Sequence, residues 1–173
     1  AEAKLFNPDF IIANMHWGLE YERIPSREQR ELADWLMRQG VDLVIGSHPH
    51  VVQPMELRRG KEGVPDRLVV YSLGNFISNM SREHTDGGVM VKVVLGRKGL
   101  RRYIASAQYS LIYSSRYKNE QGKEDIRVVP AASWSGKNQN SSFSVDSALI
   151  KYVNNTRLFL KGNNKEVEEY IFE

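Results

Sequence analysis

Three of the four histidines lie at points where predicted strands end. His16 follows the apolar run 10–13, and His48 and His50 flank Pro49 in the sequence GSHPH, directly after the apolar sequence VDLVI. Neutral imidazoles are ligands for Zn²⁺, Mn²⁺ and Fe. Histidines at strand ends also serve in packing or hydrogen bonding, so a purely structural role is the alternative. The pattern favours a metal site that contains His16, His48 and His50.

The proline between the two neighbouring histidines restricts how their side chains point. Pro49 has a φ near −65° and biases the preceding residue toward an extended conformation. We therefore expect His48 to be extended, with the imidazoles of His48 and His50 facing one cavity and addressing different ions of a pair. An ordinary proline turn with two solvated histidines is the alternative.

Two further polar residues are candidates for site chemistry. Glu20, in the sequence HWGLEY, can orient a histidine, act as a general acid or base, or form an ion pair with Arg23. Asn75, in the sequence YSLGNF, can donate a hydrogen bond to a phosphate or oxyanion, or be an ordinary turn asparagine beside glycine. His84 has no visible partner in sequence, and we expect it to be solvated.

A helix with clear end signals separates the two predicted strands. Ser26 is a good N-cap, Gln29 completes a capping box three residues later, and Gly40 suits the C-terminal end. Leu32, Trp35 and Leu36 share one face of this helix, which we expect to dock on a sheet.

The order strand, helix, strand predicts a right-handed βαβ unit with two parallel, buried strands, the first built on Phe10–Ala13 and the second on VDLVIG. Carboxyl ends of parallel strands meet at one edge of a sheet. We therefore expect His16 to lie beside His48 and His50, at the edge where open α/β sheets usually bind ligands.

The rest of the chain predicts a mixed α/β fold in a single domain, residues 1–173. Two antiparallel hairpins are expected, VVQPMEL with DRLVVYSL and GGVMVKVVLG with LRRYIASAQYSLIY, followed by a short strand at EDIRVVPA. Residues 131–142 are expected to form a loop. Helices are expected in SVDSALIKYVNNTRLFL and NKEVEEYIFE. The core then covers about 9–130, with a carboxyl-terminal helical extension over about 143–173.

Composition narrows the functional classes. The 173 residues contain no cysteine, so thiolate metal sites and disulfides are excluded, and the formal net charge is only +3. Basic residues gather at Gly96–Arg102, where they can meet a polyanion or form a solvated hairpin tip. There is no P-loop, dinucleotide-binding glycine motif, Gly-x-Ser-x-Gly elbow, nucleic-acid recognition motif or membrane-spanning apolar run. The first residues, AEAKLFNPDF, do not resemble a signal peptide or a natural start, so we expect an upstream portion.

Three blocks in this order carry a resemblance to a known family: ANMHWGLEY, then ADWLMRQGVDLVIGSHPHVVQPMEL, then VVYSLGNFI. The sequence resembles the bacterial CapA family of capsule synthesis proteins, linked to poly-γ-glutamate and related to the calcineurin-like metallophosphoesterases. The resemblance is strongest from Asp9 to Ile77 and weaker through Pro130. It implies a metallophosphoesterase-like sandwich.

The resemblance also implies roles for named residues. His16 matches the isolated metal-binding histidine of the phosphoesterase pattern. GSHPH matches the Gly-His-x-His motif with one residue inserted before His48, which makes His48 and His50 metal ligands, one for each ion of a Mn, Zn or Fe pair. Glu20 and Asn75 lie in CapA-type motifs and are expected in the site, with unassigned roles.

The family's amino-terminal Asp, His and Asn ligands have no counterpart before Asp9. The chain therefore resembles the carboxyl-terminal part of a CapA-like domain, and we expect it to be inactive alone and to bind metal weakly, or not at all, unless another chain supplies the missing half. An unpaired sheet edge would favour a homo-oligomer. Membrane association is expected only through upstream segments.

The resemblance implies a protein of capsule or poly-γ-glutamate type polymer biosynthesis at the bacterial cell envelope, with a metal-dependent phosphoesterase or hydrolase-like site. Its expected ligand is an anionic polymer or a phosphoester, and no nucleic acid is expected. The alternative is a non-catalytic polyanion-binding or assembly protein that keeps the metallophosphoesterase scaffold.

Overall fold

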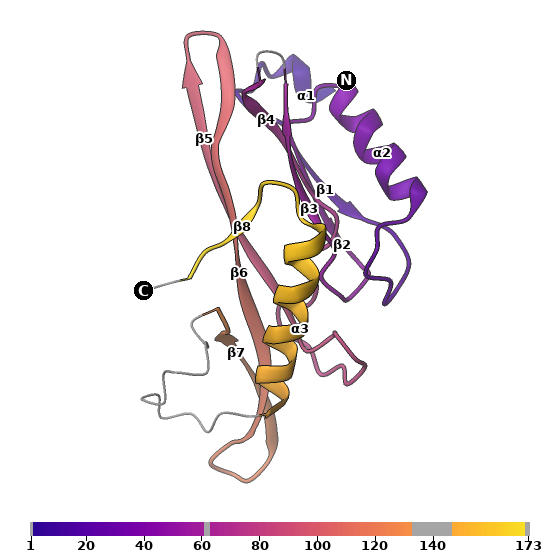
Figure 1. Ribbon diagram of the computed structural model, residues 1–173, viewed down its shortest axis with the longest axis vertical. Helices are drawn as coiled ribbons and strands as arrows, with labels where there is room; N and C mark the ends of the chain where they lie inside the picture. The colour runs from indigo at the N-terminus through magenta and orange to yellow at the C-terminus, as the bar shows by residue number, and fades with distance from the viewer. Residues whose placement is uncertain (1, 61–62, 133–146, 172–173) are drawn as a thin grey trace.

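The computed structural model describes residues 2–60, 63–132 and 147–171, and the fold is mixed α/β, as predicted. Two four-stranded sheets, which we call sheet 1 and sheet 2, lie against each other (Figure 1). The helices and strands in chain order are α1 (Glu2–Leu5), β1 (Ile12–His16), α2 (Arg27–Arg38), β2 (Leu43–Ser47), β3 (Met55–Arg59), β4 (Pro65–Val70), β5 (Gly87–Lys98), β6 (Arg101–Lys118), β7 (Glu124–Pro130), α3 (Ser147–Asn163) and β8 (Glu168–Glu169).

Sheet 1 contains the predicted βαβ unit. Its strand order is β1-β2-β4-β3, with β1, β2 and β4 parallel and β3 antiparallel to β4. The parallel pairing of β1 with β2 and the antiparallel hairpin of β3 with β4 are both confirmed. The sequence did not indicate that β4 would pair with β2, and this pairing brings a third carboxyl end to the same edge.

Sheet 2 is built on two long strands. β5 and β6 form the predicted antiparallel hairpin, β7 adds to β6 as expected, and the short β8 pairs with β6 in parallel. The main core lies between the sheets and combines Leu68 and Val70 of β4 with Ile104 and Leu111 of β6. These four side chains are at most 2% exposed. Alternate residues of β4, including Val69, face the other side of sheet 1.

Helix α2 covers that other side of sheet 1, but not with the face expected. Its buried residues are Gln29 and Ala33, while Leu32 is 38% and Trp35 51% exposed. Ala33 packs in a second core with Val44 and Val69. The predicted docking face of Leu32, Trp35 and Leu36 was therefore wrong for two of its three members. The polar Gln29 was overlooked because burial of an amide depends on hydrogen-bond partners that only the fold supplies.

Strand β1 is an edge strand, and the expectation that it is buried was wrong. Its exposure alternates along Ile12–His16, and Ile12 is 53% exposed. Strand β2, paired on both sides, is buried as expected, with Leu43 and Val44 at most 3% exposed. An apolar run indicates a strand but does not reveal whether neighbouring elements cover it.

The carboxyl-terminal region contains one of the two predicted helices. Helix α3 lies within the predicted segment SVDSALIKYVNNTRLFL and contributes Leu149, Tyr152, Val153 and Leu160 to the main core. The expected helix in NKEVEEYIFE is wrong: this segment holds β8, and the N–H of Tyr170 donates to the carbonyl of Tyr109 on β6 at 2.6 Å. Most of the loop predicted at 131–142 lies outside the described residues. No helix among those described is long and apolar enough to cross a membrane.

Candidate functional site

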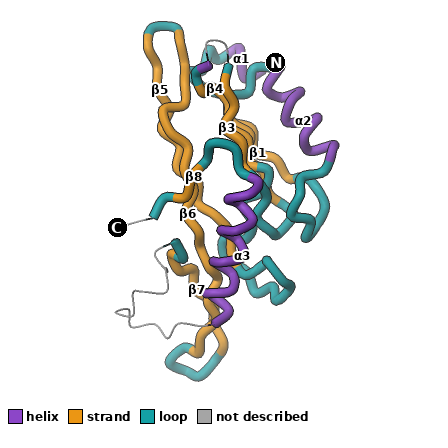
Figure 2. The backbone as a smooth tube through the Cα atoms, in the orientation of Figure 1, coloured by secondary structure: helices purple, strands orange, loops and turns teal. Residues whose placement is uncertain are grey.

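The carboxyl ends of the parallel strands bring three histidines together. In the register of sheet 1, His16 at the end of β1 lies opposite Ser47 at the end of β2, and His48 follows directly. The ring centroids of His16 and His48 are 4.6 Å apart, and those of His48 and His50 are 6.1 Å apart. Figure 2 shows the loops beyond these strand ends, on the side where α2 begins. The predicted convergence of the three side chains is confirmed.

The backbone of HPH is not extended as predicted. His48 has a φ of +101° and His50 a φ of +62°, both in the region that side-chain-bearing residues rarely adopt. Each such residue costs about 1–3 kcal/mol, and this strain persists only where surrounding contacts enforce it. One such contact is the Tyr21 N–H, which donates to the Pro49 carbonyl at 2.7 Å. Strain of this kind concentrates at functional sites.

A chain of hydrogen bonds sets the orientation of His50. Asn75 lies beyond the end of β4, and its Oδ1 is 3.1 Å from His50 Nδ1. The Asn75 amide nitrogen donates to the Thr85 carbonyl at 2.9 Å. Asn75 therefore contacts both a histidine and a backbone carbonyl, and it fixes the orientation of the His50 ring.

The other ring nitrogen of His50 faces Glu20. The distance from His50 Nε2 to Glu20 Oε1 is 4.0 Å, longer than a hydrogen bond. Three roles were considered for Glu20: orienting a histidine, acting as a general acid or base, and pairing with Arg23. The structure places Glu20 beside His50. Its alternative partner Arg23 instead places its guanidinium 3.8 Å from the centre of the Phe159 ring, and burial lowers the pKa of Arg23.

The loop that carries Glu20 is anchored through the start of α2. Ser26 and Gln29 form the predicted capping box, with the Ser26 N–H donating to Gln29 Oε1 at 3.0 Å. The Gln29 amide nitrogen donates to Gln53 Oε1 at 2.9 Å, and the Gln53 amide nitrogen donates to the Glu22 carbonyl at 2.8 Å. The buried amides of Gln29 and Gln53 thus tie the loop to the segment after GSHPH.

The glycine of GSHPH has a packing role. A Cβ on Gly46 would lie 2.0 Å from the Tyr71 carbonyl oxygen and 2.4 Å from Trp17 Nε1. The indole N–H of Trp17 donates to the same carbonyl at 2.8 Å. Because no side chain fits there, Gly46 allows Trp17 to brace the loop between β1 and α2.

Two neighbours of the histidines were not predicted from the sequence. The Tyr21 ring stacks near His50, with centroids 6.1 Å apart, and the Arg82 guanidinium lies 4.0 Å from the centre of the Tyr21 ring. Tyr21 could have been predicted as a site residue, because it follows Glu20 in HWGLEY. Arg82 could not, because it lies in a polar stretch with no recognisable motif.

The fourth histidine lies apart from this cluster. Within the described residues, His84 has no ring contact with the other three. It is partly buried rather than solvated as expected, and this burial, followed by the charge of Arg23, lowers its pKa. His84 is therefore a natural control for experiments on the site.

The donor types fit a divalent metal, but the ligand set is incomplete. Imidazole and carboxylate suit Zn²⁺, Mn²⁺ and Fe. Over residues 2–60, 63–132 and 147–171, no three His, Asp or Glu side chains are placed to hold one ion together. A metal centre that uses these histidines would require additional ligands or a local rearrangement.

Comparison with known proteins adds independent information about the same part of the chain. Residues 1–80 match the family described as bacterial capsule synthesis protein PGA_cap. The PGA biosynthesis protein CapA of Bacillus subtilis (strain 168) is 34% identical over 103 residues, which is 60% of this chain and 25% of that protein. The capsule biosynthesis protein CapA of Bacillus anthracis is 35% identical over 98 residues, 57% of this chain and 22% of that protein. The matched stretch thus spans about a quarter of either relative.

Proposed function

We propose that this chain acts in the biosynthesis of a capsule polymer of the poly-γ-glutamate type at the cell envelope, because residues 1–80 match the bacterial capsule synthesis protein family. We further propose that His16, His48 and His50, with Glu20, contribute to a divalent-metal site of the metallophosphoesterase kind. The names of the two CapA relatives support the first proposal. The second is carried by the meeting of three imidazoles at one sheet edge.

The orientation of His50 supports a role as a ligand. With Nδ1 directed at Asn75 Oδ1, the lone pair of Nε2 is left on the side of Glu20. Two ligands of one tetrahedral Zn²⁺, with bonds of about 2.0–2.2 Å, lie roughly 3.3–3.6 Å apart. At 4.0 Å, His50 Nε2 and Glu20 Oε1 would therefore need to approach slightly to bind a common ion.

The proposed chemistry is hydrolysis of a phosphoester or a related bond. When bound, a Zn²⁺, Mn²⁺ or Fe ion lowers the pKa of a bound water and polarises the phosphoryl group. The chain's own residues position the site: Asn75 holds His50, and Tyr21 and Arg82 line its flank. The Arg82 guanidinium is a suitable donor to an anionic substrate. Two ions need more ligands than these residues provide.

Metal titration tests this proposal directly. We expect Zn²⁺ or Mn²⁺ to bind the chain weakly in isothermal titration calorimetry, and His50→Ala to weaken binding by at least about tenfold, the lower end of the loss seen for supporting residues of metal sites. His84→Asn is the matched control, because His84 lies outside the cluster, and it should bind as the wild type does. Equal affinity of wild type and His50→Ala would refute the metal site.

A second candidate function is non-catalytic: the chain binds or assembles a polyanion on a scaffold that retains the histidines. An arginine-lined cleft remote from the histidines favours this candidate. Hydrolysis of a generic phosphodiester separates the two. Metal-dependent hydrolysis by the whole protein, lost in His50→Ala, supports the enzyme. Polymer binding that survives His50→Ala, without hydrolysis by the wild type, supports the binding protein.

A further inference from the structure

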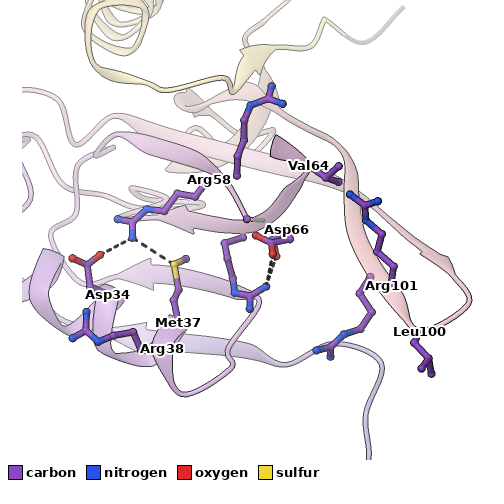
Figure 3. A pocket seen from close by; sticks show the side chains of 12 residues that line it. Asp34, Met37, Arg38, Arg58, Val64, Asp66, Leu100 and Arg101 are labelled. Carbon is purple, nitrogen blue, oxygen red and sulfur yellow. Dashed lines mark hydrogen bonds and ion pairs between the residues drawn. The ribbon is translucent and has the colours of Figure 1, made fainter. Parts of the chain in front are cut away.

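A second charged site lies at the opposite edge of sheet 1. A cleft of about 910 Å³ opens where β3 ends and β4 begins, between the last turn of α2 and the turn that joins β5 to β6 (Figure 3). The histidines lie beyond the carboxyl ends of β1 and β2, whereas this cleft lies near the amino ends of β2 and β4. The two sites are therefore separated by the length of the parallel strands.

Arginine dominates the lining of this cleft. Six arginines line it, against two aspartates: Arg38, Arg58, Arg59, Arg67, Arg101 and Arg102, with Asp34 and Asp66. The arginines come from α2, β3, β4 and β6, so residues distant in sequence converge on one cleft. Glu166 and the buried carboxylates Asp42 and Glu56 offset part of this charge. Six guanidiniums then face five carboxylates, which leaves an excess of one positive charge.

Carboxylates hold several of these arginines in place. Arg58 donates to Asp34 at 2.5 Å and to Glu56 at 2.9 Å. The Arg67 contacts to Asp42 and Asp66, at 3.3 and 3.4 Å, both use Nη1. The hydrogen bonds of Arg58 occupy all three of its nitrogens, whereas the Nε and Nη2 of Arg67 remain for a ligand. An arginine already fixed in this way loses less conformational entropy on binding.

Two exposed arginines lie on opposite walls. Arg38 ends α2 and Arg101 begins β6, and both are exposed to solvent. Figure 3 shows Arg38 and Arg101 apart from each other, with Asp66 of β4 between them. An extended ligand that crosses the cleft from one wall to the other would meet both side chains and pass over the fixed arginines between them.

We propose that this cleft binds a polycarboxylate chain, with Arg38 and Arg101 as its outer contacts and the anchored Arg67 as its floor. Guanidinium forks match carboxylate oxygens bidentately, and spaced arginines match a repeated anion better than a single one. The choice of a polycarboxylate rests on the proposed role in poly-γ-glutamate biosynthesis. The cleft itself rests on the geometry of the six arginines.

A poly-γ-glutamate oligomer of defined length is the probe, and fluorescence anisotropy of the labelled oligomer is the measurement. The double variant Arg38→Glu/Arg101→Glu should weaken binding by about tenfold or more, because it replaces two charge-assisted contacts with repulsion. The matched control is Lys118→Glu/Lys123→Glu. These exposed lysines flank the β6–β7 turn, at the end of the molecule opposite the cleft (Figure 1), and the change in net charge is the same.

The outcomes separate this proposal from that of the metal site. The arginine variant should bind Zn²⁺ as the wild type does, and His50→Ala should bind the oligomer as the wild type does. The cleft proposal is overturned if the wild type does not bind the oligomer or if the two double variants lose affinity equally. Tighter binding of polyphosphate than of poly-γ-glutamate at equal charge would overturn the choice of a polycarboxylate. None of these results depends on hydrolysis.

Discussion

The side chain of Asn75 acts as an acceptor toward His50 and as a donor toward Thr85. Its Oδ1 is 3.1 Å from His50 Nδ1, and its Nδ2 is 2.9 Å from the Thr85 carbonyl oxygen. A carbonyl only accepts, so the Thr85 contact settles which end of the Asn75 amide faces His50. In the neutral ring, His50 Nδ1 then carries the proton, and Nε2 has the free lone pair.

Asn75→Ala should release this constraint. We expect the His50 ring to populate the other tautomer, which long-range ¹H–¹⁵N NMR detects from the imidazole nitrogen shifts. Zn²⁺ affinity should fall by about 10–100-fold, as for other residues that orient metal ligands. Asn79→Ala is the control, since the Asn79 side chain is exposed. An unchanged tautomer in Asn75→Ala would contradict the assignment even if metal affinity fell.

Gly46→Ala should destabilise the protein by about 1–3 kcal/mol, the usual range for overpacking a core. The added Cβ would meet the Tyr71 carbonyl oxygen at 2.0 Å and disturb its hydrogen bond from Trp17. Urea unfolding gives the free energy of unfolding. Gly162→Ala, with no atom within 4 Å of its new Cβ, should be neutral or stabilising because alanine favours the helix. Equal effects at the two positions would argue against the close packing.

Asp42→Asn should lower the free energy of unfolding by about 1–3 kcal/mol. Asp42 is 1% exposed, accepts from the Ile11 N–H at 2.8 Å and lies 3.3 Å from the Arg67 guanidinium. Removal of its charge leaves Arg67 without a buried counter-ion. Asp66→Asn should cost less than about 1 kcal/mol, because Asp66 pairs with the same arginine in a more solvated setting. A larger loss in Asp66→Asn would reverse this ranking.

His84 should make stability depend on pH below about 6.5. Its folded pKa lies below the ordinary value of 6.5, first because burial penalises the imidazolium and second because Arg23 is near. Between the folded and unfolded pKa values the unfolded chain binds more protons, so the free energy of unfolding rises with pH. The stability from the neutral ring is complete above pH 6.5 and is lost as the pH falls through the folded value.

His84→Asn should flatten this part of the profile. Asparagine tolerates the φ of +68° at this position, so the backbone is preserved. Denaturant unfolding of both proteins at several pH values gives the difference directly. The carboxylates of Glu83 and Asp86 act against the shift and Lys151 acts with it, and all three are present in both proteins. Parallel profiles would show that His84 does not carry the dependence.

Local signals in the sequence predicted much of sheet 1. The capping box of Ser26 and Gln29 placed the helix, and the helix between two apolar runs placed His16 beside His48. Such features depend on neighbours a few residues apart and on the rule that βαβ strands are parallel. The hairpins β3–β4 and β5–β6 were also predicted from the sequence, because turn residues separate their strands.

What the sequence did not predict depends on tertiary contacts. The positive φ of His48 opposes the bias imposed by Pro49, and contacts around the loop override that bias. The exposure of Ile12 follows from the edge position of β1, which an apolar pattern does not encode. The expected final helix does not form, because Glu168 and Glu169 instead pair with the backbone of β6 as strand β8.

Strand β2 sets the distance between the two proposed sites. It has five residues and at about 3.3 Å per residue spans about 16 Å, with the histidines beyond one end and the arginine-lined cleft near the other. At this separation, substitutions at one end of the strand should not change the free energy of binding at the other. The loss of metal affinity in His50→Ala and the loss of oligomer affinity in Arg38→Glu/Arg101→Glu should therefore add without coupling in the combined variant.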